Sequence, residues 1–136
     1  MNFAIKDGRR PLFMSAHNGH IDVCQLLIKN GADVNFARED GVSPLWMSAQ
    51  NGNIEVCQLL IKNGADVNFA REDGTTPLFI PSQEGNFGVC QLLIKNGADV
   101  NFAMKDGRRP LFLSAQNGHI EVCQLCLLYT SPSPRD

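Results

Sequence analysis

The sequence has little charge and no excess of either sign. Charged residues make up 19% of its 136 residues, and 14 acidic against 12 basic residues leave a net charge of −2. This balance argues against a basic nucleic-acid-binding domain. No apolar run reaches the roughly 18 residues of a membrane-spanning helix, and the N-terminal residues lack the apolar core of a signal peptide. With 43% hydrophobic residues, the composition is that of an ordinary globular chain.

The cysteines lack the clustered pairs of a disulfide framework. Four of the five, Cys24, Cys57, Cys90 and Cys123, recur every 33 residues inside apolar runs, and Cys126 stands outside the series. One such residue per interval indicates a small buried side chain. Stacked helices lie about 8–10 Å apart, which exceeds the roughly 4.4–6.8 Å between the Cα atoms of a disulfide. We therefore expect free thiols and a reducing, cytoplasmic location.

A unit of 33 residues repeats along the chain. Its copies begin at Asn2, Asn35, Asn68 and Asn101. Such internal identity indicates one supersecondary unit that is stacked several times, because a single unit cannot bury its own apolar face.

Each unit predicts two helices and a connecting finger. In the second copy, Ser43 and Pro44 are typical of a helix start, and this short helix is expected to reach about residue 51. A second helix is predicted over roughly residues 54–63, with Gly64 as its left-handed stop. The polar Asp-Val-Asn-Phe-Ala-x-x-Asp-Gly segment between helices predicts an extended finger with a tight turn.

The unit resembles the ankyrin repeat over residues 2–125. The Thr-Pro-Leu-His-x-Ala signature of that family is similar to Thr76-Pro77-Leu78-Phe79 and Ser43-Pro44-Leu45-Trp46, and to Arg-Pro-Leu-Phe at 10–13 and 109–112. The family's Gly-Ala-Asp-Val-Asn stretch stands at residues 31–35. The resemblance implies an all-α solenoid of four helix–turn–helix units with short β-hairpin fingers. It also implies a non-catalytic scaffold that binds another protein.

The chain departs from the family pattern in its aromatic residues and in its third copy. Aromatic residues, Phe13, Trp46, Phe79 and Phe112, replace the signature histidine, and a second aromatic series follows at Phe3, Phe36, Phe69 and Phe102. Aromatic burial between repeats is expected to replace the lost Thr–His hydrogen bond. In the third copy, Pro81 is expected inside the first helix and Gly88 inside the second. We therefore predict that residues 77–90 exchange amide hydrogens faster than residues 44–57.

The repeat pattern stops after Leu125. Residues 126–136 can be a natural divergent tail, but they also resemble, codon by codon, the translated end of a transposase-based sequencing adapter. That resemblance predicts a domain boundary between residues 125 and 126 and an artefactual tail. Met1 stands where the other copies have valine, as in Val34. We therefore expect residues 1–125 to be a fragment of a longer array.

The sequence contains no convincing catalytic, cofactor or metal site. His17, His20 and Cys24 have a spacing that could hold a metal, but His20 occupies the structural Gly-His position of the resembled family. Carboxylates recur at equivalent positions of the copies, which indicates turn chemistry rather than one asymmetric active site. We expect no enzyme activity, no cofactor, no small-molecule substrate, no nucleic-acid partner and no membrane insertion.

The candidate binding positions are those that vary within the otherwise repeated unit. They lie at the finger tips, at the starts of the first helices and at the ends of those helices: Lys6, Arg9, Arg10, His17, Glu39, Val42, Gln50, Glu72, Thr75, Gln83, Lys105, Arg108, Arg109 and Gln116. The outer copies present Lys-Asp-Gly-Arg-Arg and the inner copies Arg-Glu-Asp-Gly, a charge pattern that could steer a protein partner.

Three alternatives remain open at this point. The variation could be drift at solvated positions. The array could be the targeting region of a larger enzyme, such as a kinase or ubiquitin ligase, whose catalytic domain lies outside this chain. It could also be a spacer without a dedicated partner.

Overall fold

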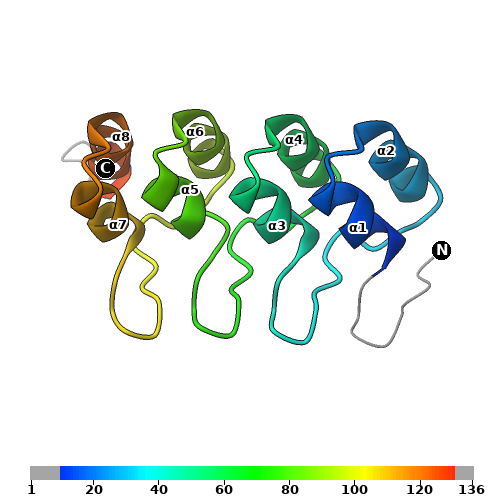
Figure 1. The fold of residues 1–136 in the computed structure, drawn as a ribbon, viewed down its shortest axis with the longest axis horizontal. Helices are drawn as coiled ribbons and strands as arrows, with labels where there is room; N and C mark the ends of the chain where they lie inside the picture. The colour runs from blue at the N-terminus through cyan, green and yellow to red at the C-terminus, as the bar shows by residue number, and fades with distance from the viewer. Residues whose placement is uncertain (1–9, 131–136) are drawn as a thin grey trace.

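A computed structural model describes residues 10–130, and these residues form four pairs of helices. The first helices of the pairs are α1 (Pro11–His17), α3 (Pro44–Gln50), α5 (Phe79–Glu84) and α7 (Pro110–Gln116). The second helices are α2 (Ile21–Lys29), α4 (Ile54–Lys62), α6 (Phe87–Lys95) and α8 (Ile120–Thr130). Figure 1 shows the pairs side by side as two rows of helices, with the connecting fingers projecting on one side. The all-α repeat solenoid is confirmed.

The ends of the helices follow from local sequence. At the start of α3, the Ser43 hydroxyl accepts a hydrogen bond from the Trp46 amide at 3.1 Å, which satisfies one of the free amides of the first turn. Arg10 and Arg109 precede α1 and α7 and provide no such side-chain bond. Gly64 follows α4 with φ of 95°, a left-handed conformation that favours glycine.

The fingers are hydrogen-bonded turns. In the second finger, the Arg38 amide donates to the Val42 carbonyl at 3.0 Å, and the Gly41 amide donates to the Arg38 carbonyl at 2.8 Å. Neighbouring fingers meet through one backbone bond, from the Glu72 amide to the Asp40 carbonyl at 2.8 Å. This is too little pairing for a strand ladder. The predicted β-hairpins are not confirmed, since no strand forms between residues 10 and 130.

A continuous core runs between the two rows of helices. Leu45, Leu60, Leu78 and Leu93 are at most 1% exposed. The first three repeats also bury a hydroxyl–thiol contact, as in Ser48 Oγ, which lies 3.4 Å from Cys57 Sγ. Because all four repeats contribute apolar side chains to one cluster, the core is continuous along the described array.

The first aromatic series is buried between repeats. Phe13, Trp46 and Phe79 are 2%, 4% and 0% exposed, whereas Phe112 in the last repeat is 50% exposed. The Trp46 indole Nε1 donates to the Thr75 carbonyl of the next repeat at 3.1 Å. Aromatic packing therefore takes the place of the signature histidine at these boundaries, as the sequence suggests.

The third repeat adapts to its proline by starting α5 late. Helix α5 begins at Phe79 rather than at Pro77, the equivalent of Pro44. Pro81 is then its third residue, where the backbone amide has no partner within a helix in any case. Pro81 therefore lies inside the first helix as expected, but in its first turn, where it removes no hydrogen bond of the helix. The late start still has a cost, because the buried Thr76 hydroxyl caps nothing and finds no partner in the described part of the chain.

Helix α8 continues past the end of the repeat pattern. It runs from Ile120 to Thr130, and Cys126 within it is fully buried. The boundary expected between residues 125 and 126 therefore lies inside a helix, and it remains a prediction about origin rather than a visible break. Residues 131–136 lie outside the described part of the chain.

Candidate protein-binding surface

Most of the variable positions lie on the surface. Eight of them are exposed: His17, Glu39, Gln50, Glu72, Gln83, Lys105, Arg109 and Gln116. Arg10 and Arg108 are partly exposed. Lys6 and Arg9 lie outside the described residues. These positions fall on two features of each repeat, the finger and the first helix, which Figure 1 shows on adjoining parts of each unit.

Two of the variable positions are buried and cannot contact a partner directly. Val42 is 1% exposed and packs in a small core with Phe13 and Trp46. Thr75 is 6% exposed, and its carbonyl accepts the indole hydrogen bond of Trp46. Both positions therefore lie beneath the candidate surface and are not part of it.

The two arginines that replace a helix cap differ in their surroundings. The Arg10 guanidinium carbon lies 3.3 Å from the centre of the Phe36 ring in the next repeat, a cation–π contact that gives this poor cap a packing role. Arg109 is exposed and lies beside the half-exposed Phe112 in an open groove of about 490 Å³ at the last repeat.

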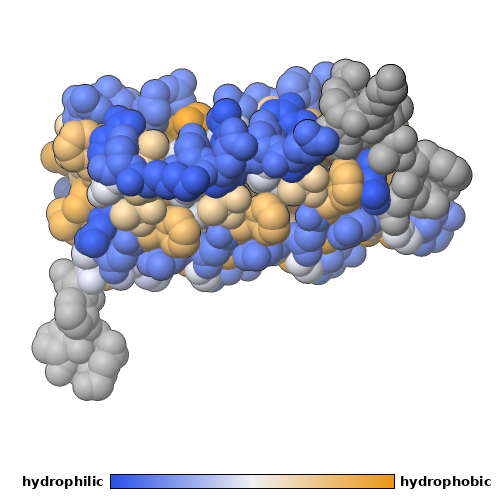
Figure 2. Space-filling model, turned by 90° about the horizontal axis from the view of Figure 1, so that it is seen from below, coloured by the Kyte–Doolittle hydropathy of each residue, from blue (hydrophilic) through white to orange (hydrophobic). Residues whose placement is uncertain are grey.

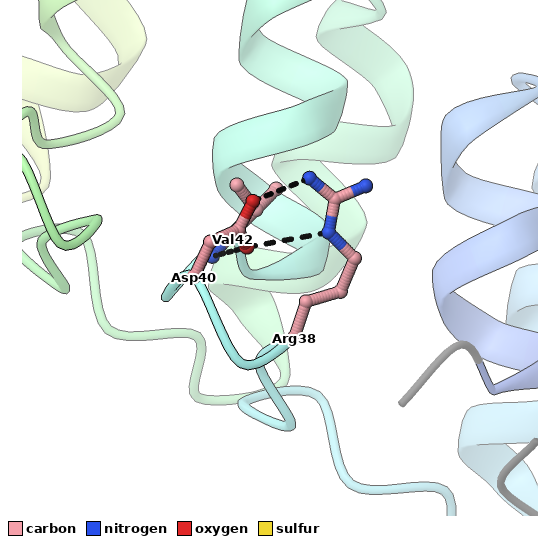
Figure 3. A network of polar contacts seen from close by, with 3 residues as sticks. All are labelled: Arg38, Asp40 and Val42. Atoms are coloured by element: carbon pink, nitrogen blue, oxygen red, sulfur yellow. Dashed lines mark hydrogen bonds and ion pairs between the residues drawn. The ribbon is translucent and has the colours of Figure 1, made fainter. Parts of the chain in front are cut away.

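Ion pairs within the fingers hold the tips in shape. Arg38 Nη2 lies 2.7 Å from Asp40 Oδ2, and Asp40 Oδ1 accepts the Val42 amide at 3.1 Å (Figure 3). The hydrogen bond from Arg38 is the main reason why the pKa of Asp40 lies below its ordinary value. In the fourth finger, Arg108 Nε lies 2.8 Å from Asp106 Oδ2. The tips are thus preformed charged turns.

Sequence reasoning missed the side chains that connect the start of a repeat to its end. The Asn35 side chain donates to the Gly64 carbonyl at 3.0 Å and accepts the Asp66 amide at 2.8 Å. Asn68 makes the same two bonds to Gly97 and Asp99, at 3.0 and 2.8 Å. An asparagine stands at the start of every copy, and this constancy was the signal that could have revealed the two bonds. An asparagine beside a turn is, however, equally typical of a local role.

The finger arginines were missed for a similar reason. The guanidinium carbons of Arg38 and Arg71 each lie 5.4 Å from the ring centre of an aromatic residue in the preceding repeat, Phe13 and Trp46 respectively. Met104 holds the corresponding position in the fourth finger. The two contacts fix the second and third fingers against the repeats before them.

Comparison with protein families agrees with this architecture. A family model described as ankyrin repeats (3 copies) matches residues 1–71 and 50–136. The chain belongs to the ankyrin-repeat family. Ankyrin repeats are generally protein–protein interaction modules and are typically non-catalytic. No curated protein gives a significant match to the chain.

The thiols of this ankyrin array are poor candidates for nucleophiles. Burial raises the pKa of Cys57 to about 11, that of Cys90 to about 12 and that of Cys126 to about 11. A nucleophilic cysteine needs the opposite shift, because the thiolate is the reactive form. All five cysteines are free, and four of them are buried.

Neither a metal cluster nor a membrane-spanning segment is found in the part of the chain that the structure describes. Between residues 10 and 130, no group of three or more His, Cys, Asp or Glu side chains could hold a metal ion. No helix in that range is long and apolar enough to cross a membrane.

Proposed function

We propose that this ankyrin array is a non-catalytic scaffold that binds another protein through its finger tips and the exposed ends of its first helices. The observation that carries the proposal is the division between constant and variable positions. Leu45 and its equivalent Leu78 are constant and at most 1% exposed. Eight of the variable positions, by contrast, are exposed on the fingers and first helices. A partner can therefore distinguish the repeats at this surface.

The charge of the proposed surface differs between the inner fingers and the fourth finger. The inner fingers present the exposed carboxylates Glu39 and Glu72, whereas the fourth finger presents Lys105 and an exposed Arg109. An asymmetric pattern of this kind fixes the orientation and speeds the encounter of a partner more than it increases affinity. We expect the partner to carry basic residues opposite the inner fingers and acidic residues opposite the fourth.

Partner capture with matched charge reversals tests the proposal. We expect Arg9→Glu combined with Arg108→Glu to lose a partner that the unmodified chain captures. The control is Lys62→Glu combined with Lys95→Glu, which reverses two exposed charges at the ends of α4 and α6. Equal loss of the partner in both pairs would show that the fingers and first helices are not the binding surface.

We also propose that the chain is part of a longer ankyrin array. Phe112 is 50% exposed, whereas its equivalents in the three preceding repeats are at most 4% exposed. Arg109 and Phe112 line an open groove at this end of the described array. A further repeat would cover this face as the inner repeats cover one another.

A long sequencing read through the coding locus tests this second proposal. We expect codon 125 to continue into Leu-Ile-Lys-Asn-Gly-Ala-Asp-Val, the sequence of the inner copies. A genomic sequence that encodes Cys126 to Asp136 followed by a stop codon would overturn it.

A further inference from the structure

A second surface runs beneath the fingers. An open groove of about 510 Å³ lies between the second and third fingers, with Phe36, Ala37, Phe69 and Ala70 among its lining residues. Both phenylalanines are partly exposed rather than fully buried. Figure 2 shows the face of the molecule seen from the finger side, where a row of hydrophobic patches runs along the array between hydrophilic borders.

The charged lining of this groove is acidic. Its charged residues are four carboxylates, Asp33, Glu39, Asp40 and Glu72, and one guanidinium, Arg38. Arg38 is already held by Asp40 at 2.7 Å, so it neutralises one of the four. Glu39 and Glu72 are exposed and make no ion pair within residues 10–130. An apolar floor with an acidic rim is complementary to a basic, partly apolar ligand.

The apolar residues that line the groove recur at a fixed interval along the array. Ankyrin units that pack through their helices advance by about 8–10 Å, so equivalent apolar positions such as Phe36 and Phe69 recur at about that interval. A polyproline II segment advances about 3.1 Å per residue and therefore about 9.3 Å in three residues. An extended peptide with an apolar side chain at every third position can thus place one apolar side chain at each of the two repeats that line the groove.

We propose that this groove binds an extended basic peptide of a partner protein, with an apolar residue at every third position. The inference rests on the proposed protein-binding function and names the chemistry of the partner. It shares Glu39 and Glu72 with the finger-tip surface, but its floor residues Ala37 and Ala70 belong to the groove alone. Variants of the floor therefore separate this site from the finger tips.

Fluorescence anisotropy with a defined probe tests the groove. The probe is a labelled twelve-residue peptide of four Leu-Pro-Lys triplets, titrated with the full chain. One control peptide carries Glu in place of Lys, and a second has the same composition with its four leucines adjacent. We expect saturable binding of the first peptide, and binding at least ten-fold weaker for either control. Equal affinity for the rearranged peptide, or no binding of the first at about 1 mM protein, would overturn the proposal.

Three variants locate the binding. Glu39→Lys combined with Glu72→Lys removes the acidic rim and is expected to weaken binding at least ten-fold. Ala70→Gln obstructs the floor without changing charge and is expected to weaken binding at least five-fold, with Ala37→Gln as its replacement if Ala70→Gln fails to fold.

Glu55→Lys combined with Glu121→Lys is the control. It changes the net charge by the same amount as Glu39→Lys with Glu72→Lys, at exposed positions of α4 and α8 outside the groove, and is expected to leave affinity within two-fold. An equal loss in this control pair would show general charge attraction and refute a groove. Unchanged affinity in the floor variant would refute it as well.

Discussion

At the scale of single residues, side chains that join segments far apart in the sequence hold the array together. Asn35 and Asn68 each make two hydrogen bonds from the start of a repeat to its end. Trp46 donates its indole hydrogen to the Thr75 carbonyl of the next repeat. The asparagine bonds therefore close the second and third units, and the tryptophan bond joins these two units to each other.

Substitution of one of these asparagines is expected to destabilise the fold. Asn68→Ala removes both bonds between the start and the end of the third repeat, and we expect a decrease in unfolding free energy of about 1–2 kcal/mol, measured by urea titration. The matched control is Asn101→Ala, since the Asn101 side chain makes no hydrogen bond within residues 10–130 and is exposed. That control is expected to change stability by less than about 0.5 kcal/mol. An equal loss at both positions would contradict the bridging role.

The ion pair at the second finger predicts a pH dependence. The pKa of Asp40 is lowered in the folded chain, chiefly by the hydrogen bond from Arg38, so its contribution is present above the ordinary Asp value of about 3.9. It is lost as pH falls through the folded pKa. We expect Asp40→Asn to lower the unfolding free energy by about 0.5–1 kcal/mol at neutral pH. The difference should disappear towards about pH 2, and a difference that persists there would refute the assignment.

At the scale of helices, the third repeat is unlike the others. Helix α5 starts late and has no side-chain cap, whereas Ser43 caps α3. Helix α6 contains Gly88, but Asn86 accepts a hydrogen bond from the Val89 amide at 3.2 Å, a cap that the equivalent Asn53 does not provide. The two irregularities therefore weaken α5 more than α6.

Amide hydrogen exchange measures this difference. We expect amides of residues 79–84 to exchange faster than those of residues 44–50, because α5 is shorter and uncapped. Helices α4 and α6 serve as the internal comparison and are expected to differ less. Equal protection of α3 and α5 would show that the late start has no energetic consequence.

The glycine in α6 offers a stabilising substitution. A Cβ at Gly88 would lie 3.4 Å from Ile54 Cδ1, an ordinary contact distance, and the equivalent residues of α4 and α8 are Glu55 and Glu121. We expect Gly88→Glu to raise the unfolding free energy by about 0.5–1 kcal/mol, from backbone entropy and a carboxylate at a helix N-terminus. Thermal melting checks this, with Glu55→Gly as the reverse change. A lower melting temperature for Gly88→Glu would contradict it.

At the scale of the whole molecule, the period of 33 residues predicted the architecture, because each copy repeats the same turns, caps and core positions. The paired helices, the glycine stops and the burial of Cys24, Cys57 and Cys90 are confirmed. Contacts between repeats were harder to predict. The stacking of Arg38 on Phe13 depends on how two units pack, and no spacing within one unit contains that information.

The sequence predicted where the candidate surface lies but not which residues belong to it. Variation among copies points to the fingers and first helices, yet Val42 and Thr75 vary and are buried. Burial keeps both side chains away from a partner. The groove beneath the fingers was not predictable, because its phenylalanines are constant in every copy and resemble core residues in the sequence.

The most direct test of the protein-binding account is NMR chemical-shift mapping of the labelled chain with and without its captured partner. The account predicts that shifts concentrate at exposed finger and first-helix positions such as Glu39, Gln50 and Lys105. The outer faces of the second helices, represented by the exposed Glu55 and Glu121, should remain unchanged. Shifts confined to the second helices would contradict the account, and so would shifts spread evenly over the array.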